Sequence, residues 1–116
     1  MCKLPDKIQP KNNAQLKQLI NYAFKHKQYD LNFIDTSKIT DMSFLFDNVN
    51  HNFDISCWDV SNVTNMEFMF CHCKQFNYDL SHWNVSKVKN MKDMFTCCDR
   101  LTIPSWYKLY HKKNKI

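Results

Sequence analysis

Cysteine and histidine side chains gather in the second half of this 116-residue chain, where they could bind a metal ion. Thiolate and imidazole groups are the usual ligands of Zn²⁺. The spacing lacks the CxxC pairs of structural zinc sites, however, and recurring cysteines beside large apolar residues are typical of core positions. We therefore expect buried thiols, assign no metal or cofactor, and regard Cys71 and Cys97 as the better candidates for a reactive or metal-linked thiol. The full group is Cys71, His72, Cys73, Cys97 and Cys98, with His51 and His82 nearby.

A recurring aspartate is the second set of side chains that could do chemistry. Its members are Asp30, Asp54 and Asp79. Paired carboxylates can hydrolyse glycosidic bonds, but no second pair lies at a suitable spacing. The chain also contains no glycine, which excludes a glycine-rich phosphate loop, and we expect no enzymatic activity. The aspartates either face solvent or a basic partner, or each accepts backbone N–H groups at the corner beside it.

A twelve-residue segment occurs three times and must position these side chains. The copies begin at Asp35, Asp59 and Asn84. Their methionines, Met42, Met66 and Met91, are 24 and 25 residues apart. A period of this length is typical of stacked supersecondary units rather than of one closed globular core.

A helix is predicted over residues 13–27, before the first copy. Its apolar residues follow helical spacing, and Asn12 or Asn13 is available as the N-cap. We expect this helix to cover the open end of the stack. The apolar positions are Leu16, Leu19, Ile20, Ala23 and Phe24.

Each repeat is predicted to contain a short strand followed by a helical turn. Residues 29–34, 53–58 and 78–83 are rich in aromatic and aliphatic side chains, which favours parallel strands. In the repeated segment, Val63, Met66 and Phe70 recur at a spacing that places them on one side of an α or 3₁₀ turn.

These patterns predict an α/β solenoid. It is leucine-rich-repeat-like, with about three 24–25-residue coils, short parallel strands, short helical turns and an N-terminal capping helix. Residues 1–28 form the capping region, 29–100 the solenoid, and 101–116 a C-terminal cap with a basic tail, all in one domain.

A family resemblance is carried by the segment Trp58-Asp-Val-Ser-Asn-Val-Thr-Asn-Met-Glu-Phe-Met-Phe70, followed by Cys73-Lys-Gln-Phe-Asn-Tyr-Asp-Leu-Ser-His-Trp83. It resembles the repeat of the BspA-like leucine-rich-repeat surface proteins, also known as the mycoplasma lipoprotein-associated repeat. The resemblance covers about residues 29–103 and implies adhesion or protein binding at bacterial surfaces, without enzyme activity. Ile34 departs from the pattern, since the other copies have Trp58 and Trp83 there.

An aromatic residue precedes each recurring aspartate, at Tyr29, Phe53 and Tyr78. Strand alternation places these rings on the side of the core, whereas a very short strand would leave them at its edge as a binding ladder. Both alternatives stay open. The predicted partner-binding residues are Asp30, Asp54, Asp79, Tyr29, Phe53, Tyr78, Phe33, Cys57 and His82.

Charge is divided along the chain. Residues 1–28 carry +5, residues 29–100 carry −4 and residues 101–116 carry +4. The acidic repeats argue against nucleic-acid binding, apart from a weak contact by the tail lysines. No apolar stretch indicates a signal peptide or a membrane span, so we predict a cytoplasmic protein with reduced cysteines. The tail lysines are Lys108, Lys112, Lys113 and Lys115.

The leading functional prediction is a bacterial, non-catalytic module that binds another protein through its exposed strand face, as a monomer or dimer. The alternatives are a phage or mobile-element inhibitor of a host nucleic-acid-handling enzyme, suggested by the acidic repeats, and a fragment of a bacterial surface adhesin, implied by the resemblance.

Overall fold

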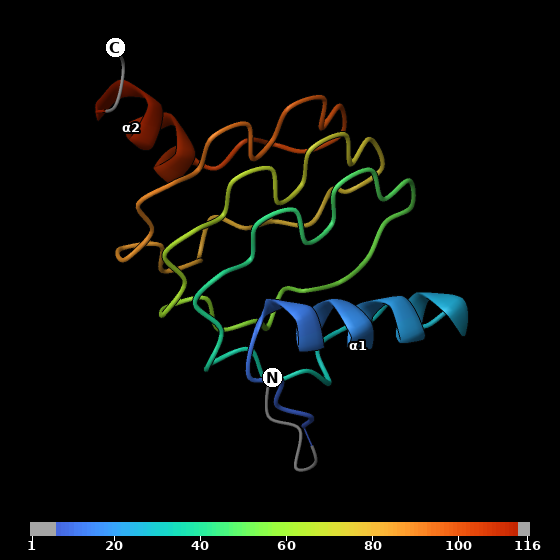
Figure 1. Ribbon diagram of the computed structural model, residues 1–116. Helices are drawn as coiled ribbons and strands as arrows, with labels where there is room; N and C mark the ends of the chain where they lie inside the picture. The colour runs from blue at the N-terminus through green and yellow to red at the C-terminus, as the bar shows by residue number, and fades with distance from the viewer. Residues whose placement is uncertain (1–6, 114–116) are drawn as a thin grey trace.

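The computed structural model describes residues 7–113, and Figure 1 shows a helix at each end of a stack of turns. The helices are α1 (Asn13–Lys25) and α2 (Ser105–Lys113). Between them the chain consists of turns and bends. Isolated parallel β-bridges join Ile8 to Ile34, Asp30 to Asp54, Asp41 to Asn65, and Asn65 to Asn90.

The predicted α/β solenoid with leucine-rich-repeat-like coils is wrong. Among the described residues the only helices are α1 and α2, and strand pairing is limited to single bridge residues without a sheet. The expected helical turn is excluded by Phe68 and His72, whose φ angles of 55° and 62° are left-handed. The expected strands end after one residue because the side chain of an aspartate accepts a hydrogen bond from the backbone N–H two residues later and closes a turn. Asp54 Oδ1, for example, accepts from Ser56 N at 2.9 Å.

Direct backbone hydrogen bonds nevertheless hold the three copies side by side. Met42 N donates to Asn65 O at 2.9 Å, and Met66 N donates to Asn90 O at 2.8 Å. The same direction recurs two residues later, where Phe44 N donates to Glu67 O at 3.0 Å. From its methionine onward the middle copy thus accepts from the first and donates to the third, whereas just before it the direction is reversed, since Thr64 N donates to Thr40 O at 2.7 Å and Lys89 N donates to Thr64 O at 2.8 Å.

Helix α1 forms where its periodicity predicts. Asn12 is the N-cap, and its side chain accepts from Gln15 N at 2.9 Å. Leu16, Ile20 and Ala23 are the buried residues of the helix. Their spacing of three and four residues places them on one face, which packs into the core.

Helix α1 also covers the outer edge of the first copy, whose carbonyl groups face away from the second. The side-chain amide of Asn13 donates to Asp41 O at 3.1 Å and to Ser43 O at 3.3 Å. Lys17 Nζ donates to Leu45 O at 2.6 Å. Carbonyl groups that would otherwise lack partners are therefore satisfied by donors from the helix.

Helix α2 lies at the opposite end and begins directly after Pro104. The sequence predicted a C-terminal cap over residues 101–116 but no helix in it. The hydroxyl of Tyr110 accepts a hydrogen bond from Met91 N at 3.2 Å. Trp106 Nε1 donates to Leu80 O at 2.9 Å. Tail residue Lys115 lies outside the described residues.

A stack of phenylalanine rings fills the core. Phe46 and Phe53 have ring centroids 4.2 Å apart, and Phe53 and Phe76 have centroids 4.6 Å apart. Phe70 continues the stack towards Phe95, at 5.5 Å. Each ring buries a large apolar area, so this stack is a principal source of stability.

Within residues 7–113, neither helix has the length and apolar character needed to cross a membrane.

Candidate functional site

An acidic cleft forms where the recurring aromatic residues and aspartates meet. Its volume is about 320 Å³. The residues that line it are Tyr29, Asp30, Asn52, Phe53, Asp54 and Tyr78. The structure therefore brings together five of the nine residues predicted to bind a partner, and this set is called the acidic cleft below.

Side-chain turns fix the aspartates of the cleft in place. Asp30 Oδ1 accepts from Asn32 N at 3.0 Å, as Asp54 Oδ1 accepts from Ser56 N. Asp79 repeats this bond with Ser81 N at 2.8 Å, outside the lining of the cleft. The corner alternative considered for these carboxylates is thus present, and it orients them.

These bonds favour the charged form of Asp54 and Asp79. Burial would raise the pKa of Asp54, but hydrogen bonds from the backbone and side chain of Ser56 and from Asn32 leave it below its ordinary value. The pKa of Asp79 is lowered chiefly by the backbone N–H of Ser81. Asp54 therefore carries a negative charge into the cleft at neutral pH.

The aromatic ladder turns out to be part core and part surface. Phe53 is buried at 1% exposure within the phenylalanine stack, whereas Tyr29 is 40% exposed. Tyr78 is half-buried. The ring of Tyr29 packs against that of His51, with ring centroids 4.6 Å apart. Two tyrosine rings thus border the cleft while a phenylalanine forms its floor.

Three further predicted residues lie outside the acidic cleft. Phe33 lines a separate groove beside α1 with Tyr22. His82 Nε2 lies 2.8 Å from Ser56 O. Cys57 is disulfide-bonded, so the expectation of reduced cysteines is wrong at this position.

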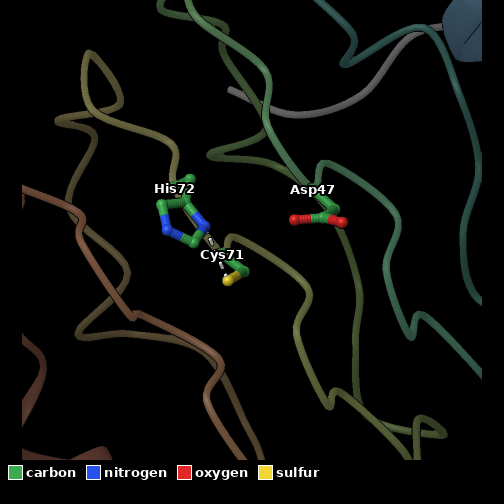
Figure 2. Close-up of side chains that lie close together, drawn as sticks. All are labelled: Asp47, Cys71 and His72. Atoms are coloured by element: carbon green, nitrogen blue, oxygen red, sulfur yellow. Dashed lines mark hydrogen bonds between the residues drawn. The ribbon is translucent and has the colours of Figure 1, made fainter.

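A second group of side chains meets at a corner between the first two copies. Asp47, Cys71 and His72 offer an oxygen, a sulfur and a nitrogen atom that all lie within 4.8 Å of one another. Figure 2 shows the imidazole bonded to the thiol, with the carboxylate of Asp47 on a neighbouring segment. The Sγ of Cys71 is 3.1 Å from Nδ1 of His72. We call these three residues the thiol corner.

The thiol of Cys71 has a raised pKa. Burial is the main cause of its raised pKa, and the nearby side chains of Asp47, Asp93 and Cys97 act in the same direction.

Cys73 and Cys98 are the buried thiols expected from the sequence. Their Sγ atoms donate to Phe46 O and Phe70 O, each at 2.9 Å. Burial raises the pKa of Cys73 to about 12 and that of Cys98 to about 11. Both are protonated core residues rather than reactive groups.

Sequence reasoning missed Asn52 in the cleft and Asp47 in the thiol corner. Asp47 follows Met42 by five residues, as Cys71 follows Met66. An alignment of the repeats that extends past the twelve-residue segment places Asp47 and Cys71 at equivalent positions of neighbouring copies.

It also missed a stacked aromatic pair, in which Phe44 is exposed and Phe68 is half-buried. Phe44 and Phe68 stack at 4.9 Å with an interplanar angle of 9°, both at left-handed φ. The repeat shows that each phenylalanine lies two residues after the methionine of its copy. It does not show that the backbone is left-handed there.

Comparison with known proteins finds a protein family that this chain matches. No curated protein and no solved structure matches the chain. Nothing found bears on the BspA-like resemblance, which stays a prediction. A family model described as "Mycoplasma protein of unknown function, DUF285" matches residues 14–113, from α1 to the end of α2. The chain belongs to this DUF285 family.

Proposed function

We propose that the protein is a non-catalytic module that binds a partner protein by receiving a lysine or arginine side chain in the acidic cleft. The observation that carries this proposal is the meeting of two carboxylates and two tyrosine rings around one opening, at Asp30, Asp54, Tyr29 and Tyr78.

The chemistry of the cleft suits a cationic side chain. A carboxylate forms charge-assisted hydrogen bonds with ammonium or guanidinium groups, which are stronger than neutral ones. Aromatic faces attract the same cations and pack against their aliphatic stems. An anionic or purely apolar ligand would leave Asp54 without compensation.

The cleft is also preorganised. Asp30 and Asp54 are each fixed by a bond to the backbone two residues ahead. Asn52 and Asn77 bond each other across neighbouring copies at 2.8 Å, beside the cleft. A rigid site loses less entropy on binding than a mobile one, which favours affinity.

The test is a charge-removing pair of substitutions that preserves the fold. Asparagine forms the same side-chain turn in this chain, since Asn65 Oδ1 accepts from Glu67 N at 3.0 Å. Asp30→Asn with Asp54→Asn should therefore leave the structure intact while removing both charges. Binding is measured by calorimetry with the tightest binders selected from a peptide library containing lysine and arginine.

We expect the double variant to bind at least about tenfold more weakly, corresponding to about 1.4 kcal/mol. The matched control is Asp59→Asn, which removes an exposed carboxylate elsewhere in the repeat. Asp59 forms the same kind of turn, because its carboxylate accepts from Ser61 N. Equal affinity of the double variant and the control would exclude the acidic cleft as the binding surface.

A cytoplasmic location remains part of this proposal. It rests on the sequence, and the disulfide at Cys57 weighs against it, because such bonds are rare in reducing compartments. Cell fractionation decides this point. The inhibitor and adhesin alternatives stay predictions.

A further inference from the structure

The thiol corner combines three different donor atoms in one place. Asp47 comes from the first copy, and Cys71 and His72 come from the second (Figure 2). The two segments are joined directly beside the site, where Asn48 N donates to Cys71 O at 2.8 Å. The proximity of the three side chains is thus fixed by backbone pairing.

The donor set discriminates among metal ions. Ca²⁺ and Mg²⁺ take oxygen ligands, so a thiol and an imidazole argue against them. Thiolate, imidazole and carboxylate together are the ligand types of Zn²⁺. Bond lengths of about 2.0–2.3 Å place tetrahedral ligands roughly 3.3–3.8 Å apart, which small side-chain rotations can reach from the present separations.

Access and charge agree with this assignment. Cys71 is buried at 6% exposure, but His72 is exposed and Asp47 is half-buried, so an ion can enter from solvent. Asp47 and Asp93 both lie near enough to act electrostatically on Cys71. These carboxylates favour a cation beside the thiol, and the ammonium group of Lys17, which interacts with Asp47, offsets part of their effect.

The thiol of Cys71 differs from the core thiols of this chain. Cys73 and Cys98 each donate to a buried backbone carbonyl. The Sγ of Cys71 instead meets an imidazole nitrogen. Cys71 thus has a neighbouring imidazole and carboxylate in place of a carbonyl acceptor.

We propose that the thiol corner is a Zn²⁺ site in which Asp47, Cys71 and His72 are the protein ligands and water occupies the fourth position. The ion would join the first copy to the second. This goes beyond the sequence prediction, which assigned no metal, and it is independent of the proposed binding of a partner at the acidic cleft.

Cobalt provides the direct test, because Co²⁺ replaces Zn²⁺ and its thiolate charge-transfer band reports a cysteine ligand. The full chain, free of any histidine tag, is titrated with Co²⁺ in oxygen-free buffer. We expect the band to saturate at one equivalent and to disappear when one equivalent of Zn²⁺ is added.

Variants locate the site without disturbing the backbone. His72→Asn is tolerated at this left-handed position, because Asn48 holds the equivalent place in the first copy with φ of 64°. His72→Asn and Asp47→Asn should each weaken metal binding at least tenfold, and Cys71→Ser should abolish the band. His26→Asn, on an exposed histidine of the α1 C-cap, should change nothing.

A stability measurement gives a second readout. Zn²⁺ in excess should raise the melting temperature of the wild-type protein, since an ion bound only by the folded state stabilises it. His72→Asn should lose this rise. Absence of the cobalt band at one equivalent, or an unchanged band in Cys71→Ser, would overturn the proposal.

Discussion

The two ends of the stack are closed by helices that solve opposite chemical problems. The first copy presents carbonyl groups at its outer edge, and α1 supplies donors to them from Asn13 and Lys17. The last copy presents N–H groups, and α2 supplies an acceptor, the hydroxyl of Tyr110. The backbone bonds that follow each methionine, from Met42 N to Asn48 N in the first copy, all run in one direction, so the two ends of this row require different caps.

The packing of the two helices differs as well. Helix α1 buries Leu16, Ile20 and Ala23, whereas α2 has no buried residue and leaves Leu109 66% exposed. Helix α2 contacts the core through the half-buried rings of Trp106 and Tyr110. Apolar burial therefore holds the first end, and aromatic edges hold the second.

The strongest test of this difference is truncation of one aliphatic side chain on each helix. Ile20→Ala should lower the free energy of unfolding by about 2–5 kcal/mol, because it opens a cavity in the core. Leu109→Ala should change it by less than about 0.5 kcal/mol. Urea denaturation followed by tryptophan fluorescence measures both, and equal losses would show that the ends are held alike.

A smaller effect is expected from the donors of α1. Asn13→Ala removes two hydrogen bonds to carbonyl groups of the first copy and should cost about 1–2 kcal/mol. Asn21→Ala is the matched control on the exposed face of the same helix and should be neutral or slightly stabilising. If both variants lose the same stability, the carbonyl edge does not depend on this cap.

The smallest effect is expected from the acceptor of α2. Tyr110→Phe keeps the ring and removes the hydroxyl that accepts from Met91 N, so it should cost about 0.5–1.5 kcal/mol. Faster amide hydrogen exchange at Met91 is the specific readout. Tyr107→Phe serves as the control, and an unchanged exchange rate at Met91 in Tyr110→Phe would contradict the assigned role.

Local patterns allowed correct prediction of α1 and of the core thiols. Helical spacing of Leu16 and Ile20, with Asn12 ahead of them, was sufficient to specify the helix and its N-cap. Cys73 and Cys98 follow the repeat period, and their burial followed from that equivalence. In both cases the residues themselves carried the information.

Strands and helical turns were predicted wrongly because side-chain turns and left-handed residues interrupt the regular backbone of this chain. Asp54 and its equivalents close turns where strands were expected. Left-handed backbone at Phe68 and His72 breaks the expected helical turn, and aromatic or histidine residues do not signal such a conformation. The sequence periods of two residues for a strand and 3.6 residues for a helix describe neither the side-chain turns nor the left-handed residues.

The sequence predicted most residues of the acidic cleft but not the full set of the thiol corner. Equivalent positions placed the recurring aspartates and aromatic rings together, and the acidic cleft contains five of them. Tyr29 is exposed whereas Phe53 is buried, although both occupy the same position of the repeat. This difference depends on the neighbours of each ring, including His51, and the repeat spacing does not predict those neighbours. The thiol corner needed Asp47, which lies just past the segment that was aligned.

The directional pairing between copies also bears on how long such a chain can be. A middle copy accepts at one edge, through Asn65 O, and donates at the other, through Met66 N. Another segment of 24 or 25 residues inserted beside it would meet both neighbours with the same groups, and neither helix would need to change. Growth by internal duplication is therefore compatible with this architecture, whereas adding a copy outside α1 or α2 would leave a cap buried between unmatched edges.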